Sequence, residues 1–289
     1  MATLRDIKRR ITAVKNTKQI TKAMKMVAAS KLRKAQTKML EMRPYADKMN
    51  EIIAGMSGDG EGLHPLLVQR PRRTVEVVVI TSDRGLCGAF NTNILKTAER
   101  LIKKYKEENF NISISVVGKK AFDYFKRRNI PIRNSWLGLS GKMTYADVQK
   151  VANDIIESYI NETVDEVFIV YNKFKSVIAQ ETQAAKLLPL SEAESAVETG
   201  TASTVFIYEP SREEIFNQLL PKNIEVQVYR ALLESQASEE GARMSAMENA
   251  TKNADEMISK LTLQYNKARQ ASITKELMDI VGGVEALKE

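Results

Sequence analysis

Residues 4–56 read LRDIKRRITAVKNTKQITKAMKMVAASKLRKAQTKMLEMRPYADKMNEIIAGM, and apolar side chains recur along them in alternating steps of three and four. Thirteen of the sixteen positions in this series are apolar, and the three exceptions, Lys18, Thr21 and Lys25, are consecutive in it. A heptad repeat of this length predicts one coiled-coil helix of about 53 residues, roughly 80 Å long. Pro44 is expected to kink or loosen this helix.

The C-terminal part of the chain carries a matching pattern. Its first series keeps the same spacing, and a second series resumes one residue out of phase. The first comprises Met244, Met247, Thr251, Ala254, Ile258, Leu261, Tyr265 and Ala268, and the second comprises Ile273, Leu277, Ile280, Val284 and Leu287. Because a heptad stripe needs a partner, the two terminal segments are expected to pack antiparallel. The alternative is two ordinary helices that fold onto the middle of the chain.

The middle of the chain alternates strand and helix patterns. The expected strands are 74–80, 112–117 and 166–171, and the expected helices are 93–106, 119–128 and 145–160. This alternation predicts a parallel sheet with right-handed crossovers. Residues 174–189 and 204–208 are expected to be antiparallel edge strands, 57–73 a linker and 191–203 a flexible loop.

The predicted fold class is therefore α/β: long N- and C-terminal helices form an antiparallel coiled coil, with an inserted Rossmann-like α/β domain. We expect three parts: an N-terminal coiled-coil helix (1–58), the α/β domain with its preceding linker (59–208) and a C-terminal coiled-coil helix (209–289).

Composition limits the chemistry that the chain can perform. The 289 residues are 43% hydrophobic and 28% charged, which is typical of a globular protein, and the longest apolar runs are only a few residues. The N-terminus resembles neither a secretory signal nor a transit peptide.

Cys87 and His64 are the only cysteine and histidine. An intrachain disulfide and a four-ligand His/Cys zinc site are thereby excluded, and His64 is expected to be a loop residue rather than a catalytic one.

Positive charge is concentrated at the N-terminus. The chain has a net charge of +8, but residues 1–38 contain twelve Lys or Arg and one acid, Asp6, so the remaining residues sum to −3. Such a segment favours an acidic partner. It contains almost no aromatic residues, which disfavours single-stranded nucleic acid but leaves duplex binding open. Since the apolar face is committed to the coiled-coil seam, membrane binding is also disfavoured. An acidic protein surface remains the best candidate.

Residues 81–91, TSDRGLCGAFN, lie between the first expected strand and the following helix. An α/β fold can bind phosphate at this place. However, the glycines are spaced GxxG rather than GxGxxG, and no GK[ST] follows. Either the segment binds a nucleotide or it is a tight turn with glycines chosen for close packing. Cys87 lies near the start of the helix, where it is either a reactive thiol or a structural one.

Three blocks carry a more specific resemblance. They are ITKAMKMVAASKLRKAQ (20–36), SDRGLCGAFNTN (82–93) and YNKARQASITKEL (265–277). In this order they resemble the gamma subunit of the F-type ATP synthase, in its bacterial form, over essentially the whole chain. The resemblance implies a non-catalytic central rotor shaft that couples ion flow through a membrane c-ring to ATP synthesis or hydrolysis at beta-subunit sites. It also implies no cofactor and no nucleotide at the GxxG turn.

The resemblance also implies partners and contact residues. One copy of the shaft would lie inside a ring of three alpha and three beta subunits, contact the epsilon subunit and the c-ring, and be peripheral on the cytoplasmic face of the bacterial cell membrane. Met24, near an acidic beta segment, and the C-terminal-helix residues Arg243, Arg269, Gln270 and Thr274 are the implied beta-subunit contacts. Tyr208 and Glu209 are the implied c-ring contacts.

Two positions depart from the family pattern. Lys25 stands where some members have an acid, and Lys275 stands where glutamine is common. Two rival hypotheses remain open at this point: a polybasic coiled-coil protein that binds nucleic acid, and a nucleotide-using α/β enzyme that depends on Gly85 or Gly88.

Overall fold

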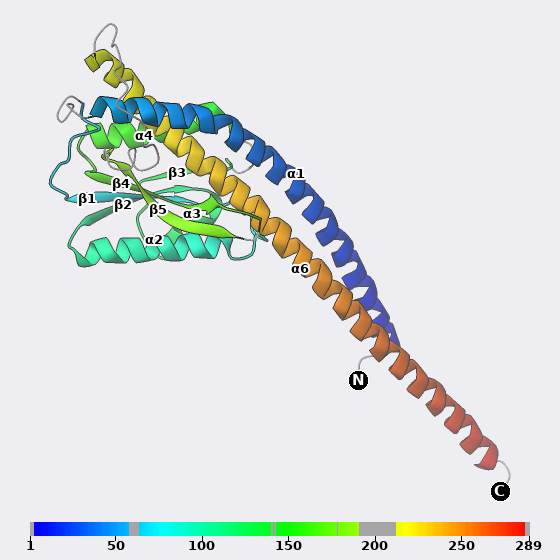
Figure 1. Cartoon of the computed structure of the whole chain (residues 1–289). Helices are drawn as coiled ribbons and strands as arrows, with labels where there is room; N and C mark the ends of the chain where they lie inside the picture. Colours follow the sequence, from blue (N-terminus) through cyan, green and yellow to red (C-terminus); the bar gives the residue numbers. More distant parts are fainter. Residues whose placement is uncertain are drawn as a thin grey trace. The chain divides into compact units, whose positions relative to one another are not determined.

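Two long helices begin and end the described chain. A computed structural model describes residues 3–57, 64–139, 141, 143–177, 179–190 and 212–286. Helix α1 is Leu4–Ser57 and helix α6 is Arg212–Ala286 (Figure 1). The chain forms two contact units, one made of residues 1–27 and 244–289 and the other of residues 28–243.

In the first unit, α1 and α6 run antiparallel. Ile7 and Thr21 of α1 are buried, as are Met247 and Ala254 of α6. These four residues belong to the two expected heptad series, so the seam is the one that the sequence predicts. Between residues 269 and 281, most side chains of α6 are exposed, including that of Ile273.

In the second unit, five strands form one sheet in the order β3-β2-β1-β4-β5. The strands are β1 (Thr74–Ile80), β2 (Asn111–Val117), β3 (Asn134–Trp136), β4 (Glu166–Phe174) and β5 (Gln180–Leu188). The first four are parallel, and β5 pairs antiparallel with β4. The parallel sheet with an antiparallel edge confirms the predicted α/β class.

Helices cover both faces of this sheet. They are α2 (Phe90–Glu107), α3 (Lys119–Arg127) and α4 (Tyr145–Ile160). In β1, Val75, Val77 and Val79 pack against α2 and α3, whereas Val78 and Ile80 pack against α4 and parts of α1 and α6. Because successive strand residues point to opposite faces, an almost entirely apolar strand is what a sheet buried on both sides requires.

Several boundaries differ from those expected. Helix α2 begins at Phe90 rather than at residue 93, and β5 begins at Gln180 because residues 175–177 and 179 connect it to β4. Strand β3 was not predicted, because this three-residue edge strand contains no apolar run. Pro44 and Pro221 both lie inside continuous helices. The expected strand at 204–208 and the loop at 191–203 lie outside the described residues.

Candidate functional site

The basic face of α1 is largely exposed. Lys8, Arg9, Arg10, Lys15 and Lys22 all lie on the solvent side of the first unit. These residues occupy the polar positions of the heptad, because the apolar positions are used for contact with α6. The structure therefore presents a cationic surface of the kind that the charge distribution predicts.

Met24 is half-buried beside the helix seam. Its neighbour Lys25 has its Nζ 3.3 Å from Oε1 of Glu248 on α6. Because the charge of Lys25 is paired with an acid of the same unit, Lys25 contributes little to the cationic surface that is free to bind a partner.

Three implied contact residues lie on the C-terminal part of α6. Arg269, Gln270 and Thr274 are all exposed. Large apolar side chains are interleaved with them and are 49–67% exposed: Ile273, Leu277, Met278, Ile280 and Val281. This stretch is therefore a mixed polar and apolar helical surface within the first unit. Ile273, Leu277 and Ile280 of the second heptad series are exposed.

Arg243 differs from the other implied contact residues because it is buried. Its Nη2 lies 2.5 Å from Oε1 of Glu239, and its Nη1 lies 2.9 Å from Oε1 of Glu240. Burial acts to lower the pKa of Arg243, but the two carboxylates outweigh burial and raise it. Lys31 of α1 also lies 3.7 Å from Glu240. Arg243 is thus held by acids of its own chain.

Tyr208 and Glu209, the implied c-ring contacts, lie outside the described residues.

The segment at the carboxyl end of β1 is a closely packed turn. Oδ1 of Asp83 accepts hydrogen bonds from the backbone N–H groups of Lys119 and Gly138, each at 3.0 Å. Lys119 is the first residue of α3. An anion bound at the start of this helix would use such donors. The carboxylate of Asp83 already occupies that place.

Other polar groups of the turn also form hydrogen bonds with residues of the same chain. Oδ1 of Asn91 accepts hydrogen bonds from the backbone N–H and the hydroxyl of Ser82. Gly88 has φ +57°, a left-handed conformation that favours glycine. Cys87 is buried, and burial raises the pKa of its thiol. These features favour the structural interpretation of both the glycines and the thiol.

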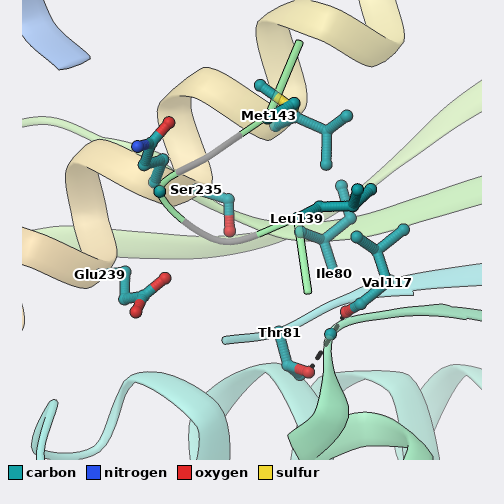
Figure 2. A pocket seen from close by; sticks show the side chains of 11 residues that line it. Ile80, Thr81, Val117, Leu139, Met143, Ser235 and Glu239 are labelled. Atoms are coloured by element: carbon teal, nitrogen blue, oxygen red, sulfur yellow. Dashed lines mark hydrogen bonds between the residues drawn. The ribbon is translucent and has the colours of Figure 1, made fainter. Parts of the chain in front are cut away.

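A small cavity lies beside this turn. It has a volume of about 30 Å³, enough for a water molecule or two but far below the roughly 300–1,000 Å³ of ordinary ligand pockets. Figure 2 shows Ser235 and Glu239 of α6 on one side and Thr81 and Val117 at the strand ends on the other. This cavity therefore gives no support to the nucleotide-using hypothesis.

His64 lies in the loop segment before β1, as expected, and its side chain is buried there; its Nδ1 accepts a hydrogen bond from the backbone N–H of Leu66. Burial lowers its pKa.

Within the described ranges, no group of three or more His, Cys, Asp or Glu side chains is placed to hold a metal ion. In the same part of the chain, no helix combines the length and apolarity needed to cross a bilayer.

Two groups of interacting residues were not predicted from the sequence. One joins Lys18, Thr21 and Lys25 to side chains on α6. The heptad interruption identified the α1 members but not their partners. The other is the ion pair between Glu76 and Arg133 inside the α/β domain, whose only signal was one acid in the apolar strand TVEVVVI.

The fold and its surfaces define a class of protein: a coiled-coil stalk with an α/β domain inserted between its two helices along the chain. A family model described as ATP synthase matches residues 3–287. The ATP synthase gamma chain of Trichlorobacter lovleyi is 49% identical over 289 residues, which is 100% of both chains. That of Anaeromyxobacter dehalogenans strain 2CP-C is 50% identical, covering 99% of this chain and all of its own. The chain therefore belongs to the ATP synthase gamma chain family.

Solved structures agree with this assignment. A chain of the central stalk and c-ring structure of Tetrahymena thermophila mitochondrial ATP synthase matches with a TM-score of 0.60 and 29% identity, covering 80% of this chain and 99% of that one. A chain from the rotor of Euglena gracilis mitochondrial ATP synthase matches with a TM-score of 0.64 at 22% identity, over 93% of this chain and 98% of that one, and this likeness concerns the fold alone.

Proposed function

We propose that the chain is the central rotor shaft of a bacterial F-type ATP synthase. It couples ion flow through the membrane c-ring to ATP synthesis or hydrolysis at beta-subunit sites and is itself non-catalytic. The observation that carries this function is the end of α6, where residues 269–281 leave the partner helix and expose large apolar side chains next to Arg269, Gln270 and Thr274. Such a surface needs a protein sleeve, because exposed apolar patches of this kind mark interaction sites.

The proposed sleeve is the ring of three alpha and three beta subunits. Met24 and the basic face of α1 would meet acidic beta-subunit segments, and Arg269, Gln270 and Thr274 would couple rotation to the beta sites. Arg243 belongs to the same proposed set, although its guanidinium is already paired with Glu239 and Glu240. Contacts to a turning shaft are expected to be weak in every state, since tight binding to one state stops rotation.

The remaining partners complete the proposal. The epsilon subunit would bind the α/β domain, Tyr208 and Glu209 would face the c-ring, and one copy would serve each complex. The complex would be peripheral on the cytoplasmic face of the cell membrane. The functional division of the chain would be an N-terminal helix (1–58), an α/β domain (59–208) and a C-terminal helix (209–289).

A tagged pull-down from solubilised membranes tests the shaft function directly. We expect a large complex that contains alpha and beta subunits and hydrolyses ATP. Recovery of the chain alone, or with nucleic acid, would contradict the proposal and favour the polybasic alternative.

A paired substitution tests the contact residues. Arg269→Ala with Gln270→Ala should leave assembly intact and lower coupled ATPase activity. Lys260→Ala with Gln264→Ala is the matched control, because both residues are exposed on the same helix and the charge change is equal. If the two variants have equal coupled ATPase activity, Arg269 and Gln270 are not the coupling contacts. The proposed shaft function would not be contradicted by that result.

A further inference from the structure

The three polar interruptions of the α1 heptad all meet polar residues on α6. Nζ of Lys18 pairs with Oδ1 of Asp255. Oγ1 of Thr21 lies 2.8 Å from Oγ1 of Thr251, and Nζ of Lys25 lies 3.3 Å from Oε1 of Glu248. We call these six residues the polar layer. Every member lies in the first contact unit.

The polar layer is placed in the seam itself. Thr21 is 8% exposed, and the next described seam positions on α6, Met247 and Ala254, are also buried. Each threonine hydroxyl is also within hydrogen-bond distance of a carbonyl of its own helix, that of Lys18 or Met247. The layer is therefore a hydrogen-bonded interior contact flanked by two partly exposed ion pairs.

Within the first contact unit, the other seam residues specify the relative height of the helices only weakly. Its residues are mostly Ile, Val, Ala and Met, and an antiparallel pair can slip by seven residues without losing its apolar stripe. A polar pair in an apolar seam is the feature that discriminates between such registers, because a slip separates its members.

The sequence allows both seven-residue slips to be compared with the observed register. In one slip, Lys25 meets Asp255, but Lys18 meets Thr262 and Thr21 meets Ile258. In the other, Lys18 meets Glu248, but Lys25 meets Gly241 and Thr21 meets Met244. Each slipped register replaces the two observed ion pairs by a single new one and places the Thr21 hydroxyl against an apolar side chain. Only the observed register satisfies all three.

We propose that the polar layer fixes the register of α1 and α6 within the first contact unit and thereby sets how far α6 extends past the start of α1. A seven-residue slip displaces the exposed stretch 269–281 by about 10 Å along the axis, at 1.5 Å per residue. The six residues are positioning residues for the surface that contains Arg269, Gln270 and Thr274. The functional part of this inference rests on the proposed coupling role of that surface.

Disulfide trapping in the purified full chain measures the register. In a Cys87→Ala background, Val14→Cys with Ile258→Cys reports the observed register. Val14→Cys with Tyr265→Cys reports one slip, and Ile7→Cys with Ile258→Cys reports the other. In the otherwise native sequence, we expect the observed-register pair to oxidise at least about tenfold faster than either slipped pair.

Charge reversal then tests the layer. Lys18→Glu with Lys25→Glu places like charges opposite Asp255 and Glu248, and each slip relieves one of the two repulsions. We expect trapping of a slipped pair to rise several-fold. Adding Asp255→Lys and Glu248→Lys should restore the original pattern. Lys260→Glu, at an exposed position of α6 outside the polar layer, is the control and should leave the trapping rate of every cysteine pair unchanged.

Two results would overturn the inference. If the charge-reversed chain remains helical and its slipped pairs trap no faster than before, the layer does not set the register. If the slipped pairs trap faster and the compensating substitutions give no rescue, the effect is general loosening rather than pairing.

ATPase measurements on the assembled complex separate this inference from the proposed function. Reversed charges should lower coupled ATPase activity, and the compensating substitutions should restore it. If the register changes in the trapping experiment while coupled ATPase activity stays the same, the polar layer still sets the register. That result would contradict the coupling role of residues 269–281.

Discussion

Nη2 of Arg133 lies 2.6 Å from Oε1 of Glu76, a carboxylate that is fully buried in the central strand of the sheet. The guanidinium also reaches Asp154 on α4, and the hydroxyl of Ser115 donates to the same Glu76 oxygen. Because every polar atom named here has a partner, the charge of Glu76 is tolerated inside the α/β domain. The ion pair joins β1 to the segment that leads into β3.

Arg133→Met is expected to destabilise the chain by about 3 kcal/mol, since it leaves the Glu76 carboxylate buried without its cation. Glu76→Leu with Arg133→Met should recover much of that loss, because an apolar pair needs no counter-charge. Urea denaturation followed by circular dichroism measures both. Arg127→Met, an exposed cation on α3, is the control. An unchanged denaturation midpoint for Arg133→Met would show that the pair contributes nothing to stability.

Gly118 predicts a second stability effect. It has φ +95°, and a Cβ built there would lie 2.1 Å from the carbonyl oxygen of Thr81. Gly118→Ala must therefore displace the backbone at the start of α3, and we expect a loss of at least about 3 kcal/mol or failure to fold.

Gly138 provides a matched control for this substitution. It has φ +79°, but nothing lies within 4 Å of a Cβ built on it. Gly138→Ala should cost only about 1 kcal/mol, from the left-handed conformation alone. Thermal unfolding of the two variants distinguishes steric conflict from backbone strain. Equal losses would mean that the contact with Thr81 is relieved at no cost.

The long helices and their seam were predictable because a heptad repeat is a local pattern. Ile7, Ala28 and Leu32 are buried at the positions expected, and the interruption at residues 18–25 was visible in the sequence. The residues of α6 that pair with this interruption were not predictable, because Thr21 and Thr251 are 230 residues apart and their pairing depends on the register of two helices. Local periodicity identifies a stripe but not its partner.

The α/β domain was predictable in its main elements and not at its edge. β1 and α4 have strong apolar patterns and were placed within a residue of their observed bounds. β3 has three residues and is held by pairing with β2 and by side-chain contacts from Asn134 to α4. Those contacts are tertiary, so no local signal marked the strand. The role of Asp83 at the start of α3 was hidden for the same reason.

Cys87 predicts slow reaction with thiol reagents. Its side chain is buried, and burial raises the pKa of the thiol, so little thiolate is present near neutral pH. Ellman's reagent at pH 8 should label it at least about tenfold more slowly than an exposed thiol. The control is Leu86→Cys with Cys87→Ala, because Leu86 is 65% exposed. Comparable rates for the two chains would show that the turn opens readily.

The same pKa shift gives a pH dependence with a definite sign. Well below pH 9, the usual pKa of a thiol, Cys87 is protonated in both the folded and the unfolded chain, so it makes no difference to stability. As the pH rises above that value, the unfolded thiol ionises first, and the free energy of unfolding falls. Cys87→Ala should weaken this alkaline loss. An identical alkaline slope in both chains, measured by urea denaturation from pH 8 to 10, would contradict the expectation.

Arg243 provides the sharpest test among the implied contact residues, because its guanidinium is bound inside its own chain. Removing it in Arg243→Met leaves Glu239 and Glu240 buried without their shared cation, and we expect the chain to lose about 3 kcal/mol of stability. Arg269→Met, at an exposed position of the same helix, should change stability by less than about 0.5 kcal/mol. Urea denaturation of the isolated chains measures this difference.

The ATPase activity of complexes that contain these variants completes the test. If Arg243 acts mainly by supporting its own domain, Arg243→Met lowers the yield of complex, while the assembled fraction keeps most of its coupling. Arg269→Met should do the opposite, with normal yield and reduced coupling. Normal stability and yield for Arg243→Met together with lost coupling would instead place Arg243 at the beta-subunit surface, and its ion pairs with Glu239 and Glu240 would then be secondary.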